Sequence, residues 1–175
     1  MDPRVTRTRA HVLAIAREIL LESGPSSLTY SALSQRSNVT RQTLYRHWTT
    51  RQALLADLVL TGPEADYPEP GDNPRDVVVA FLTSFKAGLE FPARAAALLA
   101  LAADAVHDPE SRAAVDGVAA DRRRALNALL APSGRVVHAD EFAGLCGPIM
   151  FRALFSRGKV TRRLIEQIVD AWITC

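Results

Sequence analysis

The feature that most limits the fold of this chain is the spacing of its apolar residues, which is helical almost throughout. In the first such segment the apolar positions are Val12, Ile15, Ala16, Ile19 and Leu20. This spacing places them on one face of an α-helix, and no stretch of useful length alternates as a β-strand does. Ala and Leu dominate a composition that is 48% hydrophobic and 23% charged, which is ordinary for a globular protein. The pattern predicts an all-α protein.

Glycine and proline mark where the expected helices stop. Gly24-Pro25 ends the first helix, and Gly62-Pro63 ends another that begins at Thr49 or Thr50, where Thr49-x-x-Gln52 fits a capping box. Residues 62–74, GPEADYPEPGDNP, carry four prolines and four acids and are predicted to form a loop. Beyond it, helices are expected over residues 75–91, 92–107, 109–131, 139–157 (interrupted at Gly147-Pro148) and 161–174.

Basic charge is concentrated at the N-terminal end. Residues 1–61 contain eight Arg and no Lys against four acids, whereas residues 62–175 contain thirteen basic and fifteen acidic residues. A basic first third on a mildly acidic body suggests a polyanionic partner for the first part only. Residues 1–9, MDPRVTRTR, are expected to form a flexible basic arm whose Arg4, Arg7 and Arg9 add phosphate or minor-groove contacts.

Residues 30–47 have the pattern of a helix-turn-helix. Thr29 or Ser31 can cap a short first helix, Asn38 tolerates the left-handed conformation of a tight turn, and Thr40 can cap a second helix through about His47. The major groove of DNA admits one α-helix, whose leading residues reach the base edges. Base contacts are therefore assigned to Thr40, Arg41, Gln42 and Thr43, phosphate contacts to Tyr45, Arg46 and His47, and flanking contacts to Thr29, Ser31 and Arg51. The Tyr45 ring is expected to be packed, and Trp48 to lie in the core.

Three stretches of this region carry a resemblance to a known family: AREILLESG, LTYSALSQRSNVTRQTLYRHW and TTRQALL. The run from Val12 to Leu55 resembles the DNA-binding domain of the TetR/AcrR family of bacterial transcriptional regulators. The block TLYRHW followed by TRQALL is its most specific part. The sequence departs from the family pattern at Ser34 and Ser37 (usually Ala), Asn38 (Gly), Trp48 (Phe), and Arg51 and Gln52 (Lys and Glu).

The resemblance implies a domain plan and a function. Residues 1–49 would form a three-helix DNA-binding domain with its basic arm, 50–61 a connecting helix, 62–74 a Pro-rich loop, and 75–175 a helical domain for effector binding and dimerisation. A homodimer would then bind a palindromic DNA operator in the cytoplasm and release it on binding a small-molecule effector, acting as a repressor. No other cofactor and no metal is expected.

The resemblance places the effector among the middle helices and the dimer contact on the last two. Candidate effector-binding residues are Phe81, Phe85, Leu89, Leu98, Leu101, Asp104, His107, Val118, Arg122, Cys146 and Met150. Candidate dimer residues are Phe142, Leu145, Ile149, Leu164, Ile168 and Trp172, which are more apolar than two surface helices of a small domain require.

Other classes of protein are less consistent with the sequence. An enzyme is disfavoured because the four His are dispersed and neither a Gly-rich phosphate loop nor a nucleophile elbow occurs. The two Cys lack zinc-ligand spacing, which leaves metal sensing by Cys146 with His138 a minor alternative. No apolar run reaches membrane-spanning length, and no signal peptide is recognisable. A helical protein-interaction adaptor that has lost operator binding, and an activator of the same family, remain as alternatives.

Overall fold

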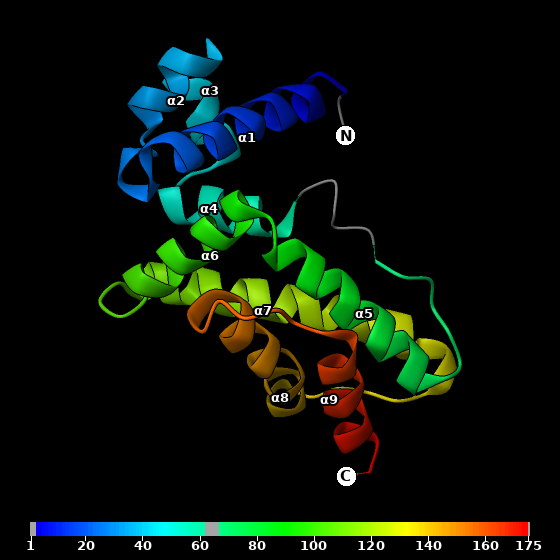
Figure 1. Ribbon diagram of the computed structural model, residues 1–175. Coiled ribbons are helices and arrows are strands. Elements are labelled where there is room, and N and C mark those ends of the chain that lie inside the picture. The colour runs from blue at the N-terminus through cyan, green and yellow to red at the C-terminus, as the bar shows by residue number, and fades with distance from the viewer. Residues whose placement is uncertain (1–2, 62–66, 175) are drawn as a thin grey trace. The chain divides into compact units, whose positions relative to one another are not determined.

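The computed structural model describes residues 3–61 and 67–174, and within them the chain forms nine α-helices and no β-strand (Figure 1). The helices are α1 Pro3–Ser23, α2 Tyr30–Ser37, α3 Arg41–His47, α4 Arg51–Leu60, α5 Pro74–Leu89, α6 Pro92–Asp104, α7 Pro109–Leu130, α8 Ala139–Met150 and α9 Arg162–Thr174. Two short 3-10 turns, Pro25–Ser27 and Ala131–Ser133, and a π-helical turn, Phe151–Phe155, complete them. The prediction of an all-α fold is confirmed.

The N-terminal segment differs from its prediction, because α1 begins at Pro3 and the expected flexible arm is helical from that residue. Residues 1 and 2 lie outside the described residues. No helix-breaking residue follows Pro3 in this segment, Arg and Ala are good helix formers, and proline is well tolerated at the first position of a helix. Arg4, Arg7 and Arg9 therefore project from a helix rather than from a flexible chain.

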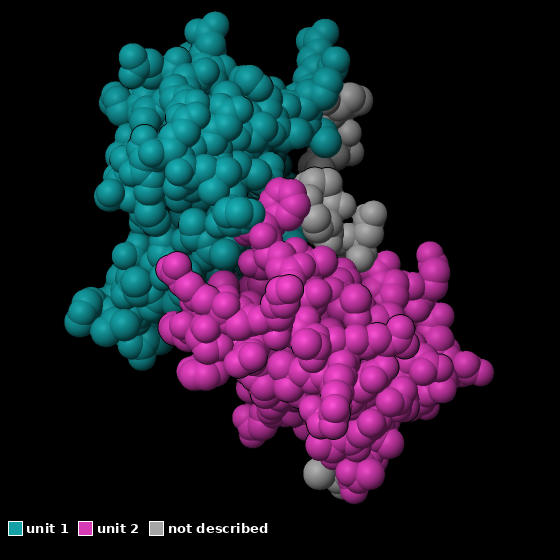
Figure 2. Space-filling view, in the orientation of Figure 1, with its two compact units in different colours: residues 1–62, 92–117 teal, residues 63–91, 118–175 magenta. Residues whose placement is uncertain are grey.

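The chain packs as two compact units, coloured separately in Figure 2. Unit 1 comprises Met1–Gly62 and Pro92–Gly117, and unit 2 comprises Pro63–Phe91 and Val118–Cys175. Within unit 1, α1 packs against α2, α4 and α6, and α4 packs extensively against α6. Fully buried side chains of this core include Val12, Ala16, Leu33, Leu44, Leu55 and Leu101. Helix α6 and the first part of α7 therefore pack with the N-terminal helices in unit 1. Of the predicted Pro-rich loop, residues 62–66 lie outside the described part of the chain.

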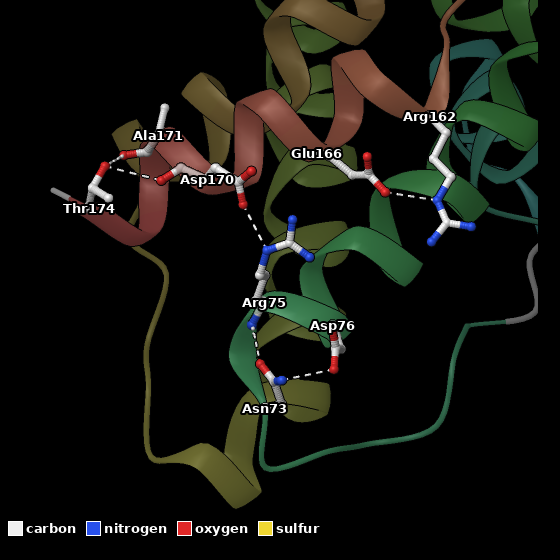
Figure 3. Close-up of polar contacts among 8 residues, drawn as sticks. All are labelled: Asn73, Arg75, Asp76, Arg162, Glu166, Asp170, Ala171 and Thr174. Atoms are coloured by element: carbon white, nitrogen blue, oxygen red, sulfur yellow. Dashed lines mark hydrogen bonds and ion pairs between the residues drawn. The ribbon is translucent and has the colours of Figure 1, made fainter.

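Unit 2 is built on α5, which packs against α8 and α9. Its core includes Val78, Phe81, Leu82, Leu126, Leu130, Leu145, Ile149 and Val169. On the surface, Arg75 Nε of α5 donates to Asp170 Oδ1 of α9 at 2.7 Å, and Arg162 pairs with Glu166 along α9 at 2.9 Å (Figure 3). Asn73 caps α5 by accepting from the Arg75 backbone N–H at 3.1 Å.

The predicted interruption of the eighth helix is milder than a break. Pro148 lies inside α8, and the helix continues through Met150 before it widens into the π-helical turn Phe151–Phe155. There the Ser156 backbone N–H donates to the Phe151 carbonyl oxygen at 3.0 Å, a bond that spans five residues. Proline removes a helical donor, and π-helical turns are short departures that occur mostly inside α-helices.

Candidate nucleic-acid interface

The turn of the helix-turn-helix forms as its sequence predicts. Thr29 Oγ1 accepts from the Ala32 backbone N–H at 3.1 Å and caps α2. Asn38 ends that helix with φ 55° and ψ 28°, the left-handed conformation that its side chain tolerates. Thr40 Oγ1 accepts from the Thr43 N–H at 3.3 Å and caps α3. Each of these groups acts on backbone only a few residues away, which is why the local sequence suffices to predict them.

The leading turn of α3 presents polar side chains to solvent. Thr40, Arg41 and Gln42 are exposed, whereas Leu44 on the opposite side of the helix is fully buried. Arg41 Nη2 donates to Ser31 Oγ at 2.6 Å, so two of the predicted DNA-contacting residues already touch. An exposed guanidinium beside an exposed carboxamide provides the bidentate donors and acceptors that read guanine and adenine in a major groove.

Tyr45 occupies an intermediate position between core and surface. Its ring stacks on Tyr30 with centroids 4.3 Å apart, yet the residue is 49% exposed. The Tyr30 hydroxyl donates to the Trp48 carbonyl oxygen at 2.7 Å, and burial raises the pKa of Tyr30 to about 12. Tyr30 is therefore a structural residue, and the partly exposed Tyr45 stacked on it can offer its hydroxyl to a phosphate. His47 is half-buried, with its ring 5.3 Å from that of Trp48.

A buried carboxylate that the sequence analysis did not single out holds three helices of this unit together. Asp57 of α4 is 6% exposed and accepts from the Trp48 indole Nε1 at 2.8 Å. It also accepts from Arg9 of α1, through Nε at 2.8 Å and Nη2 at 2.7 Å. The signal in the sequence was an acid within the apolar run LLADLVL of α4, since a buried acid requires partners. Trp48 lies in the core, as expected from the sequence.

Two arginines expected at DNA, Arg9 and Arg51, are held by the protein itself. Arg9 pairs with Asp57, and Arg51 donates to Asp104 Oδ2 at 2.9 Å and to the Pro25 carbonyl at 2.8 Å. The structure thus gives Arg51, predicted as a flanking phosphate contact, two partners within unit 1. Arg36, in the middle of the helix-turn-helix, bridges to Glu18 and Glu22 of α1.

The start of α4 also differs from the expected capping box. Thr50, not Thr49, caps the helix by accepting from the Ala53 N–H at 3.2 Å. Gln52 donates instead to Asp108 Oδ2 at 3.1 Å. Asp108 in turn accepts from Ser111 at the start of α7, through its backbone N–H at 2.9 Å and its hydroxyl at 2.6 Å. These hydrogen bonds hold the pKa of Asp108 below its usual range.

The structure divides the candidate effector-binding residues between the two units. Leu98, Leu101, Asp104 and His107 belong to unit 1, and Phe81, Phe85, Leu89, Val118, Arg122, Cys146 and Met150 belong to unit 2. Phe81, Leu89, Val118 and Cys146 are buried, while Phe85 and Met150 are half-buried. Burial raises the pKa of the Cys146 thiol to about 12. Within unit 2, a third residue, Tyr67, contacts both Phe81 and Arg122: its ring stacks on Phe81, and its hydroxyl accepts from Arg122.

Most of the candidate dimer residues are used inside the protomer. Phe142, Leu145, Ile149 and Trp172 are at most 8% exposed and belong to the core of unit 2. Trp172 is further held by Glu141, which accepts from its indole Nε1 at 3.1 Å, and by the Arg135 guanidinium 4.2 Å from its ring centroid. Only Leu164 and Ile168 keep partial exposure. The apolar character that suggested a subunit interface is accounted for, at the four buried positions, by packing within one chain.

Two further features of the described residues bear on the alternatives. In residues 3–61 and 67–174, no group of three or more His, Cys, Asp or Glu side chains is placed to hold a metal ion. None of the helices in the same ranges combines the length and the apolarity needed to cross a membrane.

Two parts of the chain match known protein families. Residues 12–58 match the family described as "Bacterial regulatory proteins, tetR family", and residues 67–172 match "Tetracyclin repressor-like, C-terminal domain". The uncharacterized HTH-type transcriptional regulator YdeS of Bacillus subtilis (strain 168) is 30% identical over 90 residues, which are 47% of this chain and 46% of the relative. The match therefore spans about half the length of that curated relative.

Solved structures show the same fold at low identity. A TetR transcriptional regulator from Agrobacterium tumefaciens matches with a TM-score of 0.62 and 19% identity, covering 96% of this chain and 93% of that one. The multidrug binding protein EbrR, complexed with imidazole, matches with a TM-score of 0.58 and 15% identity, covering 94% and 93%.

The helix-turn-helix with an exposed polar reading helix defines a DNA-binding protein. Since the two family matches together cover most of the described chain, the chain belongs to the TetR family of transcriptional regulators. The sequence prediction of this family is confirmed. The family is not an enzymatic one, so the expectation that the chain is not an enzyme is confirmed by its membership.

Proposed function

We propose that this regulator is a repressor that binds a palindromic operator as a homodimer in the cytoplasm and leaves it when a small molecule binds. The observation that carries the DNA-binding part is the leading turn of α3, where Arg41 and Gln42 are exposed beside the hydroxyls of Thr40 and Ser31. Arg41 and Gln42 read base edges, while Tyr45 and Arg46 contact phosphates.

The basic start of α1 supports the same interface. Arg4, Arg7, Thr8 and His11 of α1 line a shallow hollow of about 380 Å³ together with Val39, which lies two residues before the start of α3. A concave, basic surface next to the reading helix fits the phosphate backbone that flanks a major groove.

Operator reading is tested by fluorescence anisotropy with a duplex from the protein's own upstream region and a scrambled duplex, over a salt series. Arg41→Ala should lose about 1–3 kcal/mol of binding free energy on the native duplex, the usual contribution of one bidentate base contact. Arg162→Ala is the matched control, because Arg162 is an exposed helical arginine of unit 2. Equal, weak binding to both duplexes by the wild-type chain would favour the adaptor alternative instead.

The homodimer is proposed through the exposed side of α8 and of the π-helical turn Phe151–Phe155 that follows it, rather than through the buried residues named from the sequence. Gly144, Pro148, Phe151 and Phe155 are all exposed and follow one another at roughly helical spacing. Phe151 and Phe155 are 64% and 65% exposed and stack on each other with centroids 6.1 Å apart. Two large exposed aromatic side chains, with a small residue earlier on the same helical surface, suit close approach of the same surface of a second chain.

Gly144 allows a clean test of this dimer. A Cβ added there meets no atom within 4 Å outside its own stretch of the helix, so both Gly144→Ala and Gly144→Arg should leave the protomer folded. Only the arginine should block a partner helix. Sedimentation velocity should therefore report dimers for wild type and Gly144→Ala, and monomers of unchanged helicity for Gly144→Arg. A dimeric Gly144→Arg variant would move the interface elsewhere.

Release by a ligand is proposed by analogy, since the structural neighbour EbrR is described as a multidrug binding protein. A ligand releases DNA only if it binds the DNA-incompetent arrangement more tightly than the competent one. Such a ligand should lower the anisotropy of a preformed complex in proportion to its occupancy. Compounds that bind without changing operator affinity would argue for a constitutive regulator.

A further inference from the structure

Tyr67 lies in an unusual setting for a loop residue. It belongs to the non-helical segment before α5, yet its ring lies parallel to Phe81 of α5, with centroids 5.8 Å apart and planes 3° apart. Phe81 is 1% exposed and meets Phe142 of α8 edge-on at 6.3 Å. At the hydroxyl end, Arg122 Nη1 of α7 donates to the Tyr67 oxygen. A phenol is thus held by an aromatic floor and a guanidinium, all within unit 2.

The Tyr67 ring is also accessible from outside. The residue is 36% exposed and lines a hollow of about 740 Å³ that runs along α5, past Val79 and Thr83. The volume suits a small organic molecule. The hollow's three cations are paired with carboxylates, Arg75 with Asp170, Lys86 with Glu90 and Arg162 with Glu166. Arg122 does not line the hollow itself; it lies behind the Tyr67 side chain and donates to the Tyr67 oxygen.

The Tyr67 side chain fills a space between Phe81 and Arg122, which we call its seat. The geometry points to this seat as an effector subsite for a planar aromatic compound that carries a phenolic or carboxylate oxygen. Tyr67 is then the internal occupant that this compound displaces. The ligand would stack on Phe81 and accept from Arg122, as Tyr67 does. A carboxylate would make the stronger contact, because a hydrogen bond between two ionised groups exceeds one to a neutral phenol. This inference rests on the proposed ligand-responsive function and specifies the class of ligand.

Competition by an internal occupant has a measurable consequence. An occupant that holds the seat about 90% of the time weakens apparent ligand affinity about tenfold. Removing the phenol should therefore strengthen binding, whereas a tyrosine that simply formed one wall of the site would weaken it when removed. The sign of the change separates the two roles.

The experiment is isothermal titration of the full chain, without DNA, with 4-hydroxybenzoate. Wild type should bind it, Tyr67→Ala should bind about tenfold more tightly, and Tyr67→Phe, which keeps the ring but loses the hydroxyl, should show a smaller gain. Tyr67→Phe also serves if the alanine variant fails to fold. Cyclohexanecarboxylate, which has the charge but no flat ring, and toluene, which has the ring but no oxygen, are the control ligands and should bind at least tenfold more weakly than 4-hydroxybenzoate.

Arg122→Met in the Tyr67→Phe background tests the second contact, and the gain should disappear there. Val136→Ala, which shortens an exposed apolar side chain elsewhere in unit 2, should leave the affinity unchanged. The proposal is overturned if both Tyr67 variants bind the probe no better than wild type, or if the gain survives the loss of Arg122. Because no DNA is present, failure of operator binding would leave this result intact. Probe binding that leaves operator affinity unchanged would count against the release mechanism alone.

Discussion

Asp57→Ala is the substitution whose consequence follows most directly from the structure of unit 1. The carboxylate is 6% exposed and is the acceptor for the Trp48 indole, which is itself 3% exposed. Without it, the indole N–H remains buried and unsatisfied, which costs about 1–3 kcal/mol. The Arg9 side chain is 43% exposed, so solvent screens its ion pair and the loss there adds only about 0.2–1 kcal/mol. Together these two contributions give an expected destabilisation of about 1–4 kcal/mol.

The assay is urea unfolding followed by circular dichroism, with the free energy of unfolding extrapolated to water. Asp57→Asn should cost less than the alanine variant, because its amide oxygen can still accept from Trp48. Arg9→Gln should cost about 1 kcal/mol or less, since the exposed guanidinium gains little from the pair. Helices α1 and α4 should also lose the Arg9–Asp57 contact between them, so the rates of the slow amide exchange in both helices should rise in the alanine variant.

The reasoning would be refuted by an alanine variant within about 0.5 kcal/mol of wild type, the range of ordinary surface substitutions. It would be refuted as well by an asparagine variant as unstable as the alanine one, because the hydrogen bond to Trp48 would then not be the main contribution. A double-mutant cycle between Arg9 and Asp57 isolates the pair and should give a coupling of about 0.2–1 kcal/mol.

Three further predictions concern other groups. Arg36→Ala should destabilise by less than about 1 kcal/mol in urea unfolding, despite its two carboxylate partners, because exposed ion pairs contribute little. Cys146 should react with a thiol reagent at about pH 8 only as fast as the protein opens, because burial raises its pKa to about 12; rapid labelling of the native chain would contradict this. Asp108 has a pKa below its usual range when folded, so its stabilisation is present above about pH 4 and is lost as pH falls through the folded pKa. In Asp108→Asn, the free energy of unfolding should therefore fall less steeply as the pH is lowered below about 4. An unchanged dependence on pH in this range would refute the stabilising role of the Asp108 carboxylate.

The sequence predicted the helix-turn-helix well because the residues that determine its caps and its turn act locally. The caps at Thr29 and Thr40 and the left-handed turn at Asn38 each act on backbone within three residues. Apolar spacing likewise predicted most helix boundaries to within a few residues. The flexible arm was the main local error, because its arginines were taken as a sign of flexibility although they are compatible with a helix.

Residue roles that depend on distant partners could not be predicted in this way. Arg9 and Arg51 were assigned to DNA because they are cations near a helix-turn-helix. Their partners, Asp57 and Asp104, lie 48 and 53 residues further along the chain, and only packing brings them within reach. The same holds for Tyr67, which meets Arg122 across 55 residues.

The sequence by itself therefore determined the helices, their caps and turns, and the family to which they belong. Only the tertiary structure decided which side of α8 is core and which faces solvent. Periodicity marks an apolar stripe on a helix but not what covers it, and here α5 and α9 of the same chain cover the side that includes Phe142 and Leu145. The physical reason is that caps and turns form between neighbours in sequence, whereas burial depends on surfaces that meet only after the chain has folded.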